Sequence, residues 1–238
     1  MPGPSGLPHP HRRTASCGPP VTVYSGYVTD VASGIPLVSL RGARFLFDPG
    51  ALCLEFLTTG GPGIGARYEA LHRPADLADW LARSRLRLDP AQVDVDQTDL
   101  ADGRRMRDAL WRLVCARTGT RPPADTPSDF DATPADLDAL NEAAAHAPLA
   151  PRLAPDGTRH WALPATGRQV IASIARDAVE LLSGPYADRI RECGAHNCYL
   201  VFVDTSRPGR RRWCSMERCG NRHKVRSLRA RRDADPAD

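Results

Sequence analysis

The chain has 238 residues, of which 42% are hydrophobic and 25% are charged, and its formal net charge is +4. This composition excludes a wholly disordered chain, a collagen-like repeat and a small disulfide-stapled scaffold, and the length suits one large domain or two small ones. No apolar run approaches the ~18–20 residues of a membrane span. The first 20 residues hold six prolines and lack the apolar stretch of a signal peptide. We therefore expect a cytoplasmic protein with no membrane partner.

The charge is distributed unevenly along the chain. Residues 207–232 carry eleven basic side chains and one acidic side chain, a net charge of +10, which leaves −6 for the rest. Lys224 is the only lysine, so arginine is the basic residue almost everywhere in the chain. The use of arginine in place of lysine within this segment therefore carries little information. The clustering itself predicts a surface for nucleic acid or another anionic partner, with a merely solvated charged face as the alternative.

The N-terminal part is expected to contribute little to the core. Residues 1–43 are rich in proline and glycine and predict a disordered or poorly ordered extension, so the ordered body begins near Arg44. The dense apolar run 51–57 is either a buried helical turn or a strand, because periodicity does not distinguish the two. The glycine-rich loop 58–65 lacks the Gly-Lys-Ser/Thr of a Walker motif and favours a flexible connection over a phosphate site.

The body is predicted to be mostly helical with one small hairpin. Apolar residues repeat at helical spacing, Thr133 is a suitable N-cap and Gly119 a suitable helix stop. Between 149 and 163, Asp156-Gly157 separates two short apolar-containing runs, which indicates a β-hairpin. The predicted helices cover residues 74–86, 98–118, 134–146 and 168–183.

Four of the seven cysteines have the spacing of a metal site. Cys193, Cys198, Cys214 and Cys219 follow the pattern C-x4-C-x15-C-x4-C, and two pairs separated by a medium loop can surround one tetrahedral ion. Thiolates suit Zn²⁺, and four protein ligands leave no position for a catalytic water. We therefore predict one structural zinc ion. Disulfides are the alternative, but they fit poorly with a cytoplasmic chain and an odd number of cysteines.

The remaining candidate ligands are two histidines and three further cysteines. His196 and His223 lie within a few residues of the cysteines and could replace one of them, although we favour the all-cysteine set and expect both histidines to be exposed. Cys53 and Cys115 lie within apolar patterns and are expected to be small core residues. Cys17 lies in the N-terminal extension.

The segment around the cysteines predicts a zinc-stabilised hairpin followed by a helix. Residues 199–203 are rich in β-formers, 204–209 form a polar turn, and 211–213 return towards Cys214 as the second strand. We therefore expect the fold class α+β, with a predominantly α-helical body, a small β-hairpin and a C-terminal zinc-stabilised hairpin-helix finger. A unit of this size needs its metal for folding.

The terminal helix is predicted over 221–232. Three of its arginines fall on one face, while Val225 and Leu228 are expected to anchor another face in the finger, and Trp213 is expected to pack in the small core. Basic residues of the hairpin would contact phosphates, and those of the helix would reach further phosphates or base edges. The predicted nucleic-acid contacts are Arg207, Arg210, Arg211, Arg212, Arg222, Lys224, Arg226 and Arg229.

Two stretches of the sequence resemble known families. Cys219-Gly220-Asn221-Arg222 resembles the signature of the CGNR zinc fingers, to which residues 193–226 are similar. Residues 52–56 and 74–81 resemble the ABATE domain that usually precedes this finger, although Thr58-Thr59 stands where that domain normally has Asn-Thr. The resemblance implies a bacterial, stress-induced transcription regulator, in which the finger binds DNA and the larger domain senses a small ligand or stress signal.

Composition and resemblance together divide the chain into four parts and leave three candidate functions. A DNA-binding regulator is favoured, an RNA-binding or ribosome-associated protein is the runner-up, and an enzyme with an accessory finger comes last. The body shows no spaced His/Asp/Glu metal set, no nucleophile motif and no dinucleotide fingerprint, so we predict no catalytic residues. The ligand-binding residues and the oligomeric state are left open. The predicted parts are the extension 1–43, the ABATE-like sensor domain 44–186, the CGNR-type finger 187–232 and an acidic tail 233–238.

Overall fold

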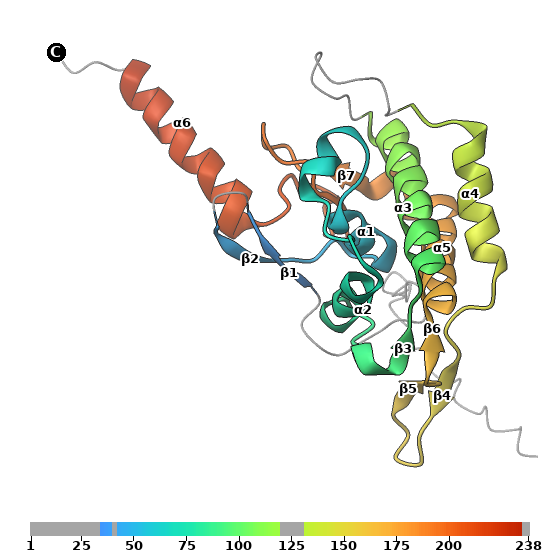
Figure 1. Cartoon of the computed structure of the whole chain (residues 1–238). Coiled ribbons are helices and arrows are strands. Elements are labelled where there is room, and N and C mark those ends of the chain that lie inside the picture. The colour runs from blue at the N-terminus through green and yellow to red at the C-terminus, as the bar shows by residue number, and fades with distance from the viewer. Residues whose placement is uncertain (1–33, 40–41, 120–130, 235–238) are drawn as a thin grey trace, which may run out of the picture.

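A computed structural model describes residues 34–39, 42–119 and 131–234 (Figure 1). The described part is predominantly helical, with short two-stranded sheets and a C-terminal four-cysteine segment followed by a helix. This confirms the predicted fold class. One hydrophobic core runs through the helices and continues into the cysteine-rich segment. No helix in the described part is long and apolar enough to cross a membrane.

The first apolar run of the body forms a short buried helix. Helix α1 covers Leu52–Phe56, so this run is a helix and not a strand. All five of its side chains are buried. Asp177 supports the first turn of α1, because its Oδ2 accepts a hydrogen bond from Cys53 N at 2.8 Å. The glycine-rich loop that follows consists of two short 3-10 segments, Leu57–Thr59 and Gly63–Tyr68.

Four longer helices form the body at the predicted positions. In Figure 1, α3 runs beside α4 and α5, and the contacts of α4 with these two helices are the most extensive between elements of the described part. Helix α1 packs against α5, which places the buried N-terminal run in the centre of the body. The helices are α2 (Pro74–Arg83), α3 (Gln97–Thr118), α4 (Pro134–Ala145) and α5 (Gly167–Ser183).

The helix ends follow local signals in the sequence. Asp96 caps α3, since its Oδ1 accepts a hydrogen bond from Asp99 N at 2.8 Å and the Asp99 carboxylate reaches back to Asp96 N. Thr133 and Asp136 form the corresponding box at α4. Gly119 ends α3 with φ 69°, a left-handed conformation that glycine adopts without strain.

Two small sheets join the lower ends of the helices in Figure 1. Strands β4 (Pro151–Leu153) and β5 (Arg159–Trp161) pair antiparallel, which confirms the predicted hairpin around Asp156-Gly157. Strands β3 (Val93–Asp94) and β6 (Ala165–Thr166) pair in parallel directly before α3 and α5.

A further hairpin precedes α1 and corrects the predicted start of the body. Strands β1 (Ile35–Val38) and β2 (Arg44–Phe47) pair antiparallel, with Ile35 opposite Phe47 and both side chains buried. The expectation that residues 1–43 are poorly ordered is therefore wrong for residues 34–39, because these bury apolar surface in the core. Residues 1–33 lie outside the described part of the chain.

The C-terminal segment has a hairpin whose strands differ from those predicted. Strand β8 (Val201–Val203) pairs antiparallel with β7 (Ile190–Glu192), which precedes the first cysteine. The expected partner, 211–213, is not a strand, although its carbonyl at Arg212 accepts a hydrogen bond from Gly194 N at 2.9 Å. The terminal helix α6 (Asn221–Ala234) forms as predicted.

Candidate metal centre and nucleic-acid interface

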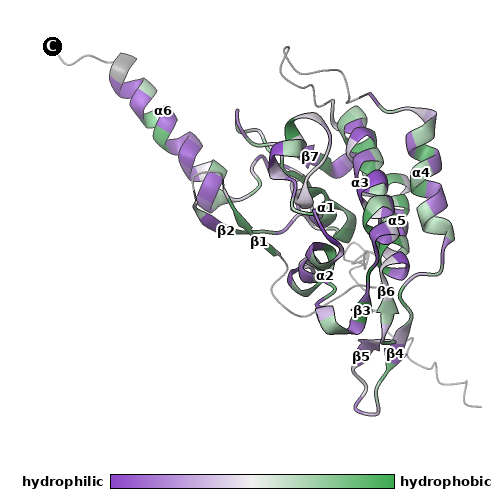
Figure 2. Cartoon of the chain, in the orientation of Figure 1, coloured by the Kyte–Doolittle hydropathy of each residue, from purple (hydrophilic) through white to green (hydrophobic). Residues whose placement is uncertain are grey.

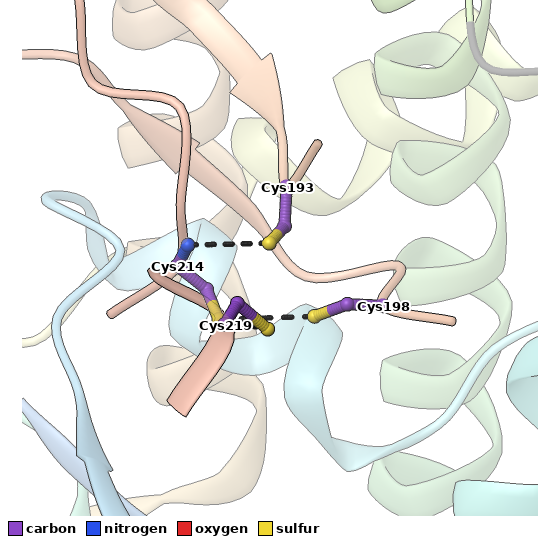
Figure 3. A group of neighbouring side chains, drawn as sticks. All are labelled: Cys193, Cys198, Cys214 and Cys219. Atoms are coloured by element: carbon purple, nitrogen blue, oxygen red, sulfur yellow. Dashed lines mark hydrogen bonds between the residues drawn. The ribbon is translucent and has the colours of Figure 1, made fainter. Parts of the chain in front are cut away.

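The four predicted zinc ligands converge at one buried point. Cys193 and Cys198 lie in the loop between β7 and β8, and Cys214 and Cys219 lie on the segment that leads into α6 (Figure 3). Their Sγ atoms all lie within 4.8 Å of one another, and the Cys198–Cys214 and Cys214–Cys219 Sγ distances are 3.7 and 3.5 Å. Tetrahedral Zn–S bonds of about 2.3 Å place sulfurs ~3.8 Å apart. The donor set therefore fits one structural zinc ion.

The four thiols are crowded and interact strongly with one another. Hydrogen bonds from Cys198 and Cys214 lower the pKa of Cys193, and the hydrogen bond to Cys193 raises the pKa of Cys198. A Zn²⁺ ion at this point would hold the cysteines as thiolates, because a coordinating thiol is deprotonated outright.

The alternative ligands lie outside the metal centre. His196 and His223 are exposed as predicted, and the His223 ring stacks on Trp213 with 4.8 Å between ring centroids. Cys53 and Cys115 are buried core residues, and burial raises the pKa of the Cys115 thiol to about 12. Among the described residues, the four cysteines are the only close group of three or more potential ligand side chains. Cys17 lies outside these residues.

Asp204 organises the turn between the two cysteine pairs. It is buried, and its Oδ1 accepts hydrogen bonds from Ser206 N at 3.0 Å and Ser206 Oγ at 2.6 Å. Its Oδ2 accepts a hydrogen bond from Arg211 N at 2.9 Å. Burial alone would raise the pKa of Asp204, but these hydrogen bonds lower it overall. Asp204 begins the predicted polar turn 204–209, and Asp followed two residues later by Ser is a recognisable signal for such a turn.

Arg211 has a structural position that its place in a basic run did not predict. Its guanidinium donates hydrogen bonds to Cys214 O at 2.7 Å, Asp48 O at 3.0 Å and Trp213 O at 3.2 Å, and it lies 4.0 Å from the Phe202 ring centroid. Burial lowers the pKa of Arg211. Arg211 therefore ties the finger to the turn before α1 instead of presenting its charge to solvent.

Arg222 lies against the metal centre. Its Nη2 donates a hydrogen bond to Cys219 Sγ at 3.0 Å, and this interaction raises the pKa of Arg222. Hydrogen bonds from outer residues orient metal ligands and balance the charge of a thiolate site. Arg222 thus supports Cys219 from the first turn of α6, whatever else its exposed part contacts.

The other predicted contact residues are all exposed, and together we call them the basic face. It consists of Arg207, Arg210 and Arg212 before the second cysteine pair and Lys224, Arg226 and Arg229 on α6. Figure 1 shows α6 projecting from the body, and Figure 2 shows that it is largely hydrophilic. The prediction that Val225 and Leu228 anchor α6 is wrong, because these side chains are 46% and 56% exposed. The helix extends past the small finger core.

Comparison with known protein families gave two matches that together cover most of the chain. Residues 50–185 match the ABATE family, whose description is "Putative stress-induced transcription regulator". Residues 189–232 match the CGNR zinc finger. Neither description is that of an enzyme family. No curated protein matches the chain.

Proposed function

The chain belongs to the ABATE family and carries a CGNR zinc finger, and from this we propose that it is a zinc-dependent, DNA-binding transcriptional regulator. The finger would bind DNA through the basic face, and the helical body would sense a small ligand or a stress signal. The observation that carries the proposal is the position of α6. A helix with six basic residues leaves the metal centre and projects into solvent.

The dimensions and chemistry of α6 suit a DNA groove. Its 14 residues span about 21 Å, and the major groove admits an α-helix. Lys224, Arg226 and Arg229 are exposed on it, so their charges are available to phosphates or to guanine edges. The exposed Val225 and Leu228 could contact thymine methyl groups in the same groove.

Zinc would position the basic face by connecting its two parts. Cys214 and Cys219 lie just before the start of α6, and Arg210 and Arg212 lie just before Cys214. Arg212 lies over the Trp213 ring at 5.1 Å, which directs a cation along the surface beside α6. Loss of the ion would therefore separate the cations before Cys214 from the cations of α6.

A binding selection tests the proposal. The full zinc-loaded chain is incubated with random duplex DNA and with total RNA as competitor, with and without a chelator. We expect enrichment of a defined duplex that chelation abolishes and zinc restores. Preferential recovery of RNA would instead establish the RNA-binding alternative, and binding that ignores chelation would exclude a finger-dependent mechanism.

A matched pair of variants separates the metal centre from general cysteine chemistry. Cys214→Ser removes a ligand and should abolish duplex binding together with zinc retention. Cys115→Ser changes a buried cysteine outside the metal centre and should retain both. Equal loss in both variants would indicate misfolding in place of a zinc-specific effect.

A further inference from the structure

A pocket lies where the helical body meets the finger. Its walls come from β1 and β2, from α1 and the glycine-rich loop, from α3, and from residues 197–201 beside the metal centre. Figure 1 shows β1 and β2 between the base of α6 and the body. Most of the lining is apolar, with Leu54, Leu57 and Ile64 on the body side and Phe45 on β2. Apolar concave sites of this kind bind small molecules.

The wall of the pocket formed by the glycine-rich loop is rigid. Gly60 has φ 139°, and a Cβ there would lie 2.9 Å from Arg107 Nη1 and 3.0 Å from Glu69 Cα. Arg107 is buried, and its guanidinium holds both oxygens of the Glu69 carboxylate at 2.9 and 2.8 Å. This bidentate pair fixes the loop around Gly60. The pocket is therefore preformed, and the loop is more than the flexible connection that the sequence favoured.

Two polar groups in the lining lack the partners that their chemistry calls for. Trp111 is buried, and its indole N–H has no hydrogen-bond partner among the described residues. A buried donor without a partner costs stability. The Arg218 guanidinium lies 4.4 Å from the Phe45 ring centroid and forms no ion pair within the described part of the chain. Arg218 therefore offers a cation beside the apolar walls of the pocket.

We propose that this pocket binds a small carboxylate with an apolar aromatic or aliphatic group. The apolar group would occupy the space between the leucines, Ile64 and Phe45, and the carboxylate would pair with Arg218. Arg218 is suited to this role because arginine binds carboxylates in a planar, bidentate geometry. A neutral molecule of the same shape would leave that cation without a partner.

The position of Arg218 connects the pocket with the finger. Arg218 lies in the turn Met216–Gly220, between two zinc ligands and directly before α6, while Cys198 of the other pair also lines the pocket. A carboxylate on Arg218 would hold this turn against the body and neutralise a cation at the base of the basic face. We therefore expect the ligand to weaken duplex binding. This regulatory part rests on the proposed function, whereas ligand binding itself does not.

Direct binding measurements test the pocket without DNA. Benzoate and hexanoate, with benzyl alcohol and hexanol as neutral counterparts, are titrated into the full zinc-loaded chain and followed by calorimetry and ligand-observed NMR. We expect the carboxylates to bind on the order of tenfold more tightly than the alcohols. Acetate, which has almost no apolar group, should bind more weakly than benzoate and hexanoate. Equal affinity of acids and alcohols, or no binding of either acid at millimolar concentration, overturns the proposal.

Variants assign the binding to the pocket. Arg218→Gln should remove the preference for carboxylates, and Ile64→Trp should fill the pocket and abolish binding of both classes. Arg44→Gln removes the same charge from an exposed position on β2 outside the lining, and it should retain wild-type affinity. Zinc content and melting temperature identify any variant that fails to fold. A preference for carboxylates that survives in folded Arg218→Gln would exclude the assigned site.

Duplex binding with and without benzoate separates the two proposals. Carboxylate binding through Arg218 in a chain that binds no duplex would support the pocket and refute the proposed function. Duplex binding without carboxylate binding would do the reverse. If both occur, linkage requires that duplex weakens benzoate binding by the same factor by which benzoate weakens duplex binding. Mutually independent binding would overturn the regulatory part.

Discussion

At the scale of single residues, arginines that are adjacent in sequence have different physical roles. Arg210 and Arg212 are exposed, whereas the Arg211 guanidinium is held by three main-chain carbonyls and the Phe202 ring. One of these carbonyls belongs to Asp48, which is 163 positions away in the sequence. A hydrogen-bonded cation of this kind stabilises a docked structure more than a solvated one.

We therefore expect Arg211→Ala to lower the free energy of unfolding by about 2 kcal/mol, because it leaves partly buried carbonyls without donors. Arg212→Ala should change it by less than about 0.5 kcal/mol, as at most exposed sites. Denaturant unfolding of the zinc-loaded chains measures both. Equal losses in the two variants would contradict the structural role of Arg211.

Buried carboxyls provide a second prediction, which concerns pH. Burial raises the pKa of Asp177 in the folded chain above its ordinary value of 3.8. As the pH rises above 3.8, the Asp177 carboxyl therefore loses its proton first in the unfolded chain. The stability of the fold then decreases until the pH has passed the pKa of the folded state. Asp177→Asn removes this term and can still accept the hydrogen bond from Cys53 N. The stability of the variant relative to wild type should therefore increase with pH across that interval.

Glu69→Gln provides a comparison of opposite sign. Burial would raise the pKa of Glu69, but the hydrogen bonds from Arg107 outweigh it and lower the pKa overall. The ionised Glu69 carboxylate thus stabilises the fold at pH values above the ordinary pKa of glutamate. This stabilisation is lost as the pH falls through the pKa of Glu69 in the folded state. Chemical unfolding across the acid range should give opposite slopes for the two variants, and parallel slopes would contradict the assignment.

At the scale of elements, local signals define the helices of the body, while partners distant in sequence define the finger. The capping boxes at α3 and α4 are short-range features, so these helices could be predicted within a few residues. The zinc ligands could be predicted for the same reason, because their spacing is a property of the local sequence.

The pairing of β7 could not be predicted in this way. Its three residues carry no alternating pattern, and the strand exists because Ile190 and Val203 meet in the core. The same holds for β1, whose Ile35 is buried opposite Phe47 of β2. Arg218 likewise owes its candidate role to its position against Phe45, which the local sequence does not indicate.

The exposed face of α6 leads to a prediction about salt. If Arg226 and Arg229 each neutralise one phosphate, replacing both by alanine should reduce the slope of log affinity against log salt by about 2. Arg152→Ala with Arg168→Ala removes two exposed arginines from the helical body and should leave the slope unchanged. Titrations of a selected duplex at several salt concentrations measure both, and equal slopes in all three proteins would exclude α6 from the contact surface.

At the scale of the whole molecule, the finger and the body share a core. Val203 N donates a hydrogen bond to Pro49 O at 2.8 Å, and a Cβ on Gly50 would lie 3.3 Å from Val203 Cβ, so β8 packs closely on the turn before α1. Phe202 and the four cysteines are buried in the same cluster as the residues of α1 and α5. The metal centre is therefore part of the core and not a separate domain on a linker.

This continuity leads to a prediction about zinc removal. Metal binding contributes to folding free energy when the unfolded chain cannot form the site. Because the site is joined to the core through β8, chelation should lower the melting temperature of the body as well as unfold the finger. Calorimetry should show one cooperative transition in the zinc-loaded chain, and chelator should shift this transition to a lower temperature. After chelation, hydrogen exchange should be faster in α1 as well as in β7 and β8. A body that melts at the same temperature without zinc would show that the body and the finger fold independently. A ligand in the pocket between them could then not act on the finger through the shared core.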